Sequence, residues 1–507
     1  MTRGKTIVKG AFILTLANLV TRVMGFVYRI FMSKALGAHG MGVYQLIMPV
    51  YMLVFSLCAS GLATAVSNCI AARRQSGDTG GTGKILLSAV SFSLLFSFAA
   101  CGAVYFGAEY IASGILHEPN TLLALRIISL CFPFMCAGAV LRGYFYGMQK
   151  MAVPAAAQVL EQSIRIALVY FLCSQMLAKG LKYACAMAVM GMACGEIGSF
   201  LFTLAVFMPH KKALSKHSRL TYKNAAKTVI AMALPLTLNR GTASALSTLE
   251  HILIPQRLML HGMTNDSAVS LFGGLCGMAV PLVMFPCSLL SALAAAIMPA
   301  ISEYHAGRNK AAAARTLECA LLFTTVLGIF ACGVFIVFPE QICRAVYGRG
   351  DIAYLLRMLG LICPFLYTQV IFSAALNGIN LQMYIFKLGI LGFLISIAAV
   401  YFLIPRYGIH AYIAGQAVSA IMTNRLCAAR LEKETGRFGA GTAAAAKCLL
   451  SAAAVLLCAR LVFKGITPSL PMLAAVIGIC FAAYAVLLAL LGLSVPFGIS
   501  RAKFMLE

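Results

Sequence analysis

The chain has 507 residues, of which 61% are hydrophobic and only 11% are charged. Soluble domains carry about 25% charged residues, so a large water-soluble core is excluded. The formal net charge of +26 would suggest a nucleic-acid partner if the protein were soluble. In this chain the basic residues separate long apolar runs, which instead indicates a polytopic membrane protein that binds no nucleic acid.

Apolar runs long enough to span a membrane recur from the beginning of the chain to its end. A spanning helix needs about 20 mostly apolar residues. The pattern predicts an all-α polytopic membrane fold with about fourteen transmembrane helices. The predicted spans are 9–36, 43–71, 85–114, 121–147, 152–177, 182–208, 226–259, 268–301, 314–341, 352–377, 383–404, 409–430, 442–463 and 470–494.

The distribution of basic residues predicts the orientation of these spans. With the N- and C-termini in the cytoplasm, the segments on the cytoplasmic side hold most of the 40 Lys and Arg residues. This asymmetry follows the positive-inside rule. The densest basic segment is the loop at 210–227, which we expect to touch anionic membrane lipids.

An internal repeat appears when the chain is compared with itself at an offset of 231 residues. The offset aligns Arg126 with Arg357, Pro133 with Pro364, Gly147 with Gly378, and Tyr170-Phe171 with Tyr401-Phe402. It corresponds to six spans, an even number, so the two copies share one orientation in the membrane. We therefore expect two six-helix lobes related by a parallel repeat, at 1–209 and 228–433, joined by the basic loop. Residues 434–507 form an extra helix pair and a tail outside the repeat.

Polar residues inside the apolar runs form two stripes on helix faces. The first stripe is Asn18, Arg22, Arg29 and Ser33, and the second is Asn239, Glu250 and Arg257, with Arg240, Glu161 and Arg165 nearby in other runs. Spacings of 4, 7 and 11 residues return to nearly the same angle of a helix. An arginine in hydrocarbon costs at least about 2.5–3.5 kcal/mol, so such residues normally face a watery cavity or the interior of a bundle. The stripes lie on the first helices of the two lobes, and the duplication predicts that they face each other across a path for an anion.

Two interpretations of the first stripe remain open. Arg22 and Arg29 either hold an anionic ligand or form structural ion pairs with Glu250 or Glu161. Glu161 and Arg165, four residues apart, are expected to pair with each other.

The other polar residues also have alternative interpretations. Glu250 either carries a coupling ion or serves as a structural partner of an arginine. Arg257 either guards an exit or reaches the lipid headgroups. Arg142, at the cytoplasmic end of a span, is interpreted as an anchor that extends to the membrane surface.

Motifs for catalysis, nucleotide binding and metal binding are missing from the sequence. It contains no HExxH, GxSxG or Walker pattern. The 18 cysteines are scattered through apolar runs without a CxxC pair, so we expect no disulfide framework and no metal site. The expectation is a protein that is not an enzyme and has no cofactor, driven by H⁺, Na⁺, the membrane potential or consumption of its product.

Two segments resemble a known family, TRVMGFVYRIFMSKALGAHGMGVYQLIMPVY (Thr21–Tyr51) and LRGYFYGMQKMAVPAAAQVLEQSIRI (Leu141–Ile166). They are similar to polysaccharide exporters of the superfamily that also contains multidrug extrusion antiporters and lipid II flippases. Within it, the chain most resembles the stage V sporulation protein B branch, which is linked to cortex peptidoglycan synthesis. The resemblance extends over essentially the whole chain.

The resemblance implies a two-lobe transporter in the bacterial plasma membrane that moves an undecaprenyl-linked saccharide from the inner to the outer leaflet. Arg22 falls on an arginine of the cationic cavity of lipid II flippases. The family pattern has an arginine where this chain has Tyr28 and an acidic residue at the position of Arg29, and this departure bears on the identity of the substrate. The extra helix pair is implied to hold the polyprenyl tail, and cell-wall synthesis enzymes are candidate partners.

The sequence also allows other functions besides lipid-linked oligosaccharide transport. The first is an ion-coupled multidrug efflux antiporter, which would favour an anionic or aromatic cavity rather than one rich in arginine. A membrane-embedded transferase would need an acidic metal site or a large external loop. A passive scaffold would leave the arginines within the spans without an explanation.

The charge pattern makes a topological prediction. A cysteine introduced at Lys216 should be protected from an impermeant thiol reagent in intact cells, whereas one at Lys464 should be labelled, because only the first lies in a cytoplasmic segment. The parent protein gives the background of its 18 native cysteines. Labelling of position 216 from outside would contradict the fourteen-span topology.

Overall fold

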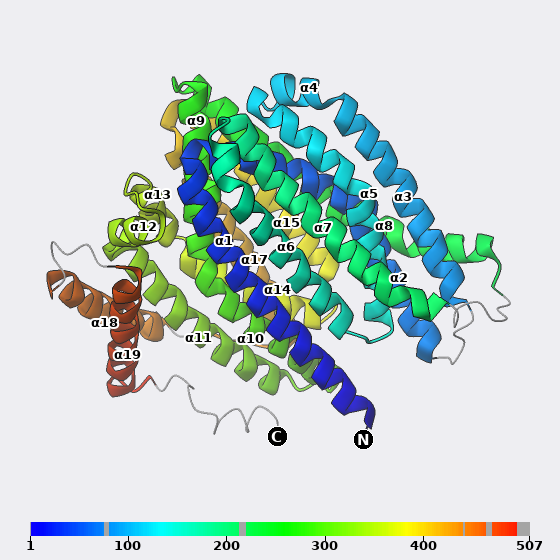
Figure 1. The fold of residues 1–507 in the computed structure, drawn as a ribbon. Helices are drawn as coiled ribbons and strands as arrows, with labels where there is room; N and C mark the ends of the chain where they lie inside the picture. Colours follow the sequence, from blue (N-terminus) through cyan, green and yellow to red (C-terminus); the bar gives the residue numbers. More distant parts are fainter. Residues whose placement is uncertain (1, 76–80, 212–219, 440–441, 463–468, 494–507) are drawn as a thin grey trace. The chain divides into compact units, whose positions relative to one another are not determined.

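The computed structural model describes residues 2–75, 81–211, 220–439, 442–462 and 469–493. Every regular element among these residues is a helix, which confirms the predicted all-α fold. Figure 1 shows the course of the chain through these helices, which form two compact units. Unit 1 contains Met1–Met259 and Met263–Gly273, and unit 2 contains Leu260–Gly262 and Gly274–Glu507. Most of the predicted basic loop, 212–219, lies outside the described residues.

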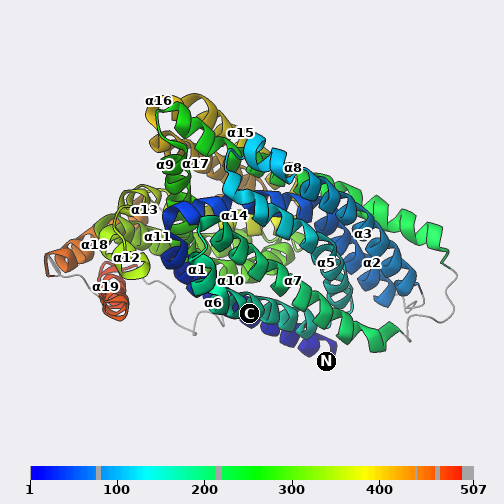
Figure 2. The ribbon, with the colours of Figure 1, turned by 45° about the horizontal axis from the view of Figure 1, so that its top comes forward.

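Unit 1 begins with a 54-residue helix that bends at one glycine. Its elements are α1 (Thr2–Phe55), η1 (Ser56–Ser60), α2 (Gly61–Gln75), α3 (Thr82–Phe106), α4 (Ala108–Tyr110), η2 (Ile111–Ile115), η3 (Pro119–Thr121), α5 (Leu122–Gly147), α6 (Ala152–Leu177), α7 (Leu181–Lys211), α8 (Tyr222–Leu260) and α9 (Asn265–Phe272). Gly37 has φ 68° and ψ −173°, a conformation that a side chain would disfavour. The bend falls between the predicted spans 9–36 and 43–71. Figure 2 shows α2, α3 and α5 side by side in this unit.

Unit 2 follows a similar order and adds two helices at its end. Its elements are η5 (Gly273–Ala279), α10 (Val280–Ala306), α11 (Lys310–Val337), α12 (Pro339–Tyr347), α13 (Ala353–Gly360), α14 (Cys363–Gly378), α15 (Gln382–Ala398), η6 (Ala399–Leu403), α16 (Ile404–Tyr407), α17 (Ile409–Thr435), α18 (Thr442–Val462) and α19 (Leu470–Leu490). Pro364 lies in the first turn of α14, next to a 52° bend between α13 and α14. The added helices α18 and α19 lie beside α11 and α12 (Figure 1).

The described part of the chain has ten helices that are long and apolar enough to cross a membrane, or eleven if the bent pair α13 and α14 is one span. One of the ten runs from Ile13 to Gln75, and its 63 residues extend about 95 Å at 1.5 Å per residue, enough for two crossings of a core about 30 Å thick. Helices α8 and α17, which correspond to the predicted spans 226–259 and 409–430, are not among these helices. The chain is a multi-pass membrane protein, and the count of fourteen stays a prediction.

The two units repeat the same helix contact at the predicted offset. A Cβ atom added to Gly147, at the end of α5, would lie 2.7 Å from the carbonyl oxygen of Ser67. One added to Gly378, at the end of α14, would lie 2.6 Å from the carbonyl oxygen of Met298. Both members of the second contact lie 231 residues after those of the first, and Ile70 and Ile301 complete both contacts in the same way. The structure therefore supports the internal duplication.

This contact predicts the effect of adding a single methyl group at each site. Gly147→Ala and Gly378→Ala should each lower the melting temperature, because overpacking at a close backbone approach costs about 1–3 kcal/mol. Gly102→Ala and Gly389→Ala are matched controls, since an added Cβ meets nothing within 4 Å at either position. The controls should be neutral or stabilising, because alanine favours helix over glycine by about 1 kcal/mol. Equal effects at all four glycines, measured by thermal unfolding in detergent, would contradict the shared contact.

Candidate functional site

All nine residues predicted to contact substrate lie in unit 1. They occupy α1 (Asn18, Arg22, Arg29), α6 (Glu161, Arg165) and α8 (Asn239, Arg240, Glu250, Arg257). The structure therefore describes their surroundings within one compact body.

The stripe on α1 changes from exposed to buried along the helix. Asn18 and Arg22 are exposed, Arg29 is half-buried and Ser33 is 2% exposed. Because α1 packs against α6, its buried end lies close to the polar residues of that helix. The hydroxyl of Tyr28 is buried without a hydrogen-bond partner among the described residues, near the guanidinium groups of Arg29 and Arg165. The beginning of the stripe is therefore accessible, whereas its end is packed inside unit 1.

Helix α6 carries an ion pair that faces α7. Arg165 Nη2 lies 2.8 Å from Glu161 Oε1, and both side chains are 17% exposed, which confirms the pairing expected from their spacing. A Cβ atom added to Gly195 of α7 would lie 2.6 Å from the Glu161 carbonyl oxygen, so the glycine permits the close approach of the two helices. The neighbouring residue in the chain, Glu196, is thereby brought towards the α6 pair.

Glu196 connects the α6 pair to residues of α1 and α5. The Tyr51 hydroxyl donates a 2.7 Å hydrogen bond to Glu196 Oε1. Arg142 Nη2 lies 3.9 Å from Glu196 Oε2, and Arg142 Nη1 donates a 3.2 Å bond to Ser199 Oγ. The interpretation of Arg142 as a surface anchor is wrong, because its side chain is only 17% exposed and points to this carboxylate.

Unit 1 therefore contains a cluster of two arginines and two carboxylates, Arg142, Arg165, Glu161 and Glu196, hereafter the charged cluster. Its formal charge is balanced, because each guanidinium has one carboxylate partner. The sequence analysis did not predict that Arg142 and Glu196 belong to this cluster, nor that Tyr51 donates a hydrogen bond to it. The Gly-x-x-x-Gly spacing of Gly191 and Gly195, which marks a close helix contact, was the available signal.

Helix α8 packs on the turn between α1 and α2. Arg240 Nη1 donates to the carbonyl oxygen of Ser60 at 2.8 Å and to Thr64 Oγ1 at 3.0 Å. Ser60 ends the π-helical turn η1, and such turns are frequent at functional positions of helices. Further along, Thr248 Oγ1 donates to the Pro49 carbonyl oxygen at 3.2 Å. The unit thus includes α8, the first helix of the predicted second lobe.

The remaining residues of the α8 stripe differ in exposure. Asn239 and Arg257 are half-buried, and Glu250 is 3% exposed. Arg257 lies in the last turn of α8. That the α1 and α8 stripes face each other, and that these residues bind substrate, stay predictions.

The charged cluster predicts coupling between the two residues of the α6 pair. Arg165→Ala should destabilise the protein by about 3 kcal/mol, because it leaves a largely buried carboxylate without its partner. The double variant Glu161→Gln with Arg165→Gln should lose less unfolding free energy than the sum of the losses in Glu161→Gln and Arg165→Gln. The exposed pair Arg430–Glu434, 2.9 Å apart, is the matched control, for which a loss of about 0.5 kcal/mol or less is expected. Additive effects of Glu161 and Arg165 in thermal unfolding would contradict the pairing.

Comparison with known proteins shows which family and which relatives the chain is similar to. The family described as polysaccharide biosynthesis protein matches residues 7–305. Stage V sporulation protein B of Bacillus subtilis (strain 168) is 29% identical over 436 residues, which are 85% of this chain and 84% of that protein. The lipid II flippase MurJ of the same organism is 25% identical over 60% of this chain and 59% of its own length.

A solved structure extends the similarity to the fold. The structure of lipid II flippase MurJ in an inward closed conformation has a TM-score of 0.73 and covers 95% of this chain and 98% of its own, at 15% sequence identity. At that identity the similarity concerns the fold. Since the family match covers more than half of the residues, the chain belongs to the polysaccharide biosynthesis protein family.

Proposed function

We propose that this protein moves an undecaprenyl-linked saccharide, lipid II or a related polysaccharide unit, from the inner to the outer leaflet of the bacterial plasma membrane by alternating access. The family membership supports this proposal, as do the names of a lipid II flippase and a sporulation protein among its relatives. In this view the chain is a transporter and not an enzyme, and both of its termini are cytoplasmic.

The observation that carries the proposal is the exposure of Arg22 within an apolar span. Arg22 and Asn18 are exposed on α1, inside the run from Ile13 to Gln75 that qualifies as membrane-spanning. An arginine facing hydrocarbon is costly, so an exposed arginine at this depth favours a water-filled path. Arg142 and Arg165 have carboxylate partners in the charged cluster and do not need a ligand to balance them.

The chemistry of arginine suits a pyrophosphate. Its planar guanidinium can donate two parallel hydrogen bonds to two phosphate oxygens. Arg22 and Arg29 are seven residues apart on one helix, or about 10 Å along its axis. That distance suits a pyrophosphate together with the first part of a sugar head, and Arg240 and Arg257 supply further positive charge on α8.

The energy source and the partners complete the proposal. Glu250 is a candidate carrier for H⁺ or Na⁺, because it is a buried carboxylate within an apolar helix. The membrane potential is the alternative driving force. The expected partners are the lipid-linked saccharide, membrane lipids and enzymes of cell-wall synthesis, with no nucleic acid.

Ion-coupled multidrug efflux is the second candidate function. The fold of this superfamily also serves multidrug transporters, so the fold does not separate the two functions. The excess of arginine over carboxylate in the apolar runs disfavours a cationic drug as substrate. Efflux of a cationic dye by cells that produce the protein, without restoration of saccharide export in an exporter-deficient strain, would favour the drug transporter.

The flippase proposal predicts a graded response at Arg22. Arg22→Ala should reduce transport of a fluorescent lipid-linked saccharide in proteoliposomes at least about tenfold, because a charge-assisted hydrogen bond contributes about 1.5–3 kcal/mol. Arg22→Lys should retain intermediate activity, since lysine keeps the charge but cannot bind two oxygens in a planar fork. The control is Arg126→Ala, an exposed arginine 5.9 Å from the ring centre of Tyr105, and it should leave transport near that of the parent.

A double variant separates the ligand role from a structural one. If Arg22 served only to balance Glu250, then Arg22→Ala combined with Glu250→Ala would restore transport by removing both charges. The ligand role requires the double variant to stay inactive at normal protein levels in the membrane. Recovery of transport would overturn the assignment of Arg22 to the substrate.

A further inference from the structure

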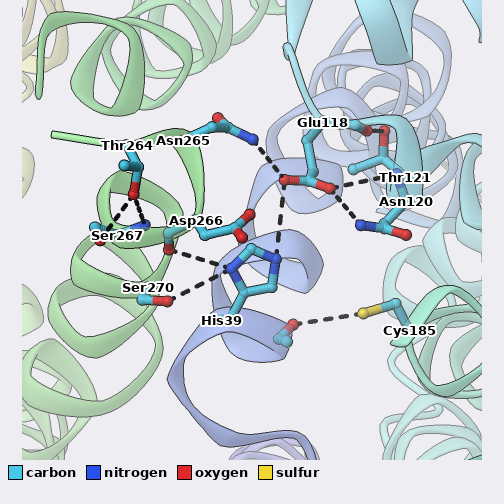
Figure 3. A network of polar contacts seen from close by, with 11 residues as sticks. His39, Glu118, Asn120, Thr121, Cys185, Thr264, Asn265, Asp266, Ser267 and Ser270 are labelled. Atoms are coloured by element: carbon cyan, nitrogen blue, oxygen red, sulfur yellow. Dashed lines mark hydrogen bonds and ion pairs between the residues drawn. The ribbon is translucent and has the colours of Figure 1, made fainter. Parts of the chain in front are cut away.

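Three side chains with metal-binding atoms meet in unit 1, and none of them belongs to the charged cluster (Figure 3). They are His39 of α1, Glu118 of the connection between η2 and η3, and Asp266 in the first turn of α9. One ligand atom of each lies within 4.8 Å of those of the other two. We refer to these three residues as the His39 site.

The backbone holds these segments together independently of any ion. A Cβ atom on Gly42 would collide with the carbonyl group of Val269, and one on Gly273 would collide with the backbone of Ala38 and Gly42. Helices α1 and α9 therefore touch directly through their backbones. Asp266 is close to His39 because this contact fixes the position of the first turn of α9.

The orientation of His39 is fixed by its second nitrogen. Its Nδ1 lies 3.2 Å from the carbonyl oxygen of Asp266 and 3.5 Å from Ser270 Oγ. A carbonyl oxygen only accepts, so Nδ1 carries the proton in this contact and the neutral ring has its lone pair on Nε2. That nitrogen lies 3.9 Å from Glu118 Oε2, too far for a hydrogen bond. A metal-binding histidine typically donates its other N–H to a carbonyl group in this way.

Glu118 is oriented by neutral donors on both of its oxygens. Asn120 Nδ2 donates to Oε1 at 2.7 Å, and Asn265 Nδ2 donates to Oε2 at 3.1 Å. The residue is 1% exposed. Among the described residues, the only side chain recorded as an ion-pair partner of Glu118 is His39. A buried carboxylate without a permanent cation is unfavourable, so a positive ion at this position would lower its free energy.

We propose that His39, Glu118 and Asp266 bind a divalent transition-metal ion, with Zn²⁺ as the best fit. Zinc accepts one imidazole nitrogen at about 2.0–2.1 Å and carboxylate oxygens at about 2.0–2.2 Å, so two ligand atoms of its tetrahedral site lie about 3.4 Å apart. His39 Nε2 and Glu118 Oε2 are 3.9 Å apart and all three ligand atoms lie within 4.8 Å of one another, so small side-chain movements would close the site around the ion. Asp266 is exposed, and its side chain is free to rotate towards the ion. Calcium and magnesium prefer oxygen ligands only, which disfavours them here.

The bound ion would connect three segments that are distant in the sequence. It would join the part of α1 that follows the Gly37 bend, the connection before α5, and α9, the segment that follows α8. Because α8 carries four of the nine candidate substrate residues, the ion would stabilise the position of the end of that helix. The site does not depend on the proposed substrate, so its test does not depend on transport.

The test measures zinc binding by the purified full-length protein in detergent after removal of metal with a chelator. Addition of Zn²⁺ should raise the melting temperature of the parent protein by at least about 2 °C, because a ligand of the folded state stabilises it. Titration against a zinc-sensitive dye should show that His39→Gln and Asp266→Asn each lose one bound equivalent and the thermal shift. The control His117→Gln, an exposed histidine next to Glu118, should bind zinc as the parent does.

Several outcomes would overturn the site. They are the absence of a zinc effect in the parent, an equal effect in His39→Gln and Asp266→Asn, and an equal shift with Ca²⁺ or Mg²⁺ in place of Zn²⁺. An equal effect in the variants would assign the metal to other histidines or cysteines. Both substitutions avoid the buried Glu118, so the test remains valid if Glu118→Gln does not fold.

Discussion

The cost of placing a charge in hydrocarbon determines how this protein uses its intramembrane arginines. The arginines of unit 1 lie in two different surroundings. Arg165 and Arg142 lie within the helix packing, where Glu161 and Glu196 balance them. Arg22 is exposed on α1, where an anionic ligand can reach its guanidinium group. Replacing a buried pair by apolar residues of similar volume is often neutral, so the net stability from the charged cluster is small, whereas the loss of one partner is costly.

Close packing of α6 against α7 makes the pairing of arginines with carboxylates possible. The Glu161 carbonyl lies where a side chain on Gly195 would sit, and this proximity brings the carboxylates of α6 and α7 towards one another. Helix association in a membrane relies on packing and hydrogen bonds because lipid supplies no hydrophobic driving force between helices. The recurrence of the Gly147 contact at Gly378 shows that the duplicated sequence preserved such close approaches in both units.

The sequence predicted features that depend on local pattern and composition. It predicted the helical fold, the boundary between the spans 9–36 and 43–71, the repeat offset and the pairing of Glu161 with Arg165. These features follow from hydrophobicity, from comparison of the sequence with itself or from spacing along one helix. It did not predict that Arg142 contacts Glu196, because that contact joins α5 to α7. The sequence did not predict the His39 site either. Its three residues lie in segments separated by more than 70 residues, and no fixed spacing connects them.

For helix α8, the internal repeat and the observed contacts assign the helix to different parts of the protein. By the repeat, α8 begins the second lobe, yet its hydrogen bonds run to Ser60, Thr64 and Pro49 of unit 1. Arg240 illustrates the consequence, because its guanidinium binds the carbonyl of Ser60 at the end of a π-helical turn. A π-helical turn adds one residue to a helix and perturbs its regular hydrogen bonds, so a cation there gains a partner at little cost to the helix. The contacts of Arg240 therefore give it a structural role at this turn in addition to its predicted role in substrate binding.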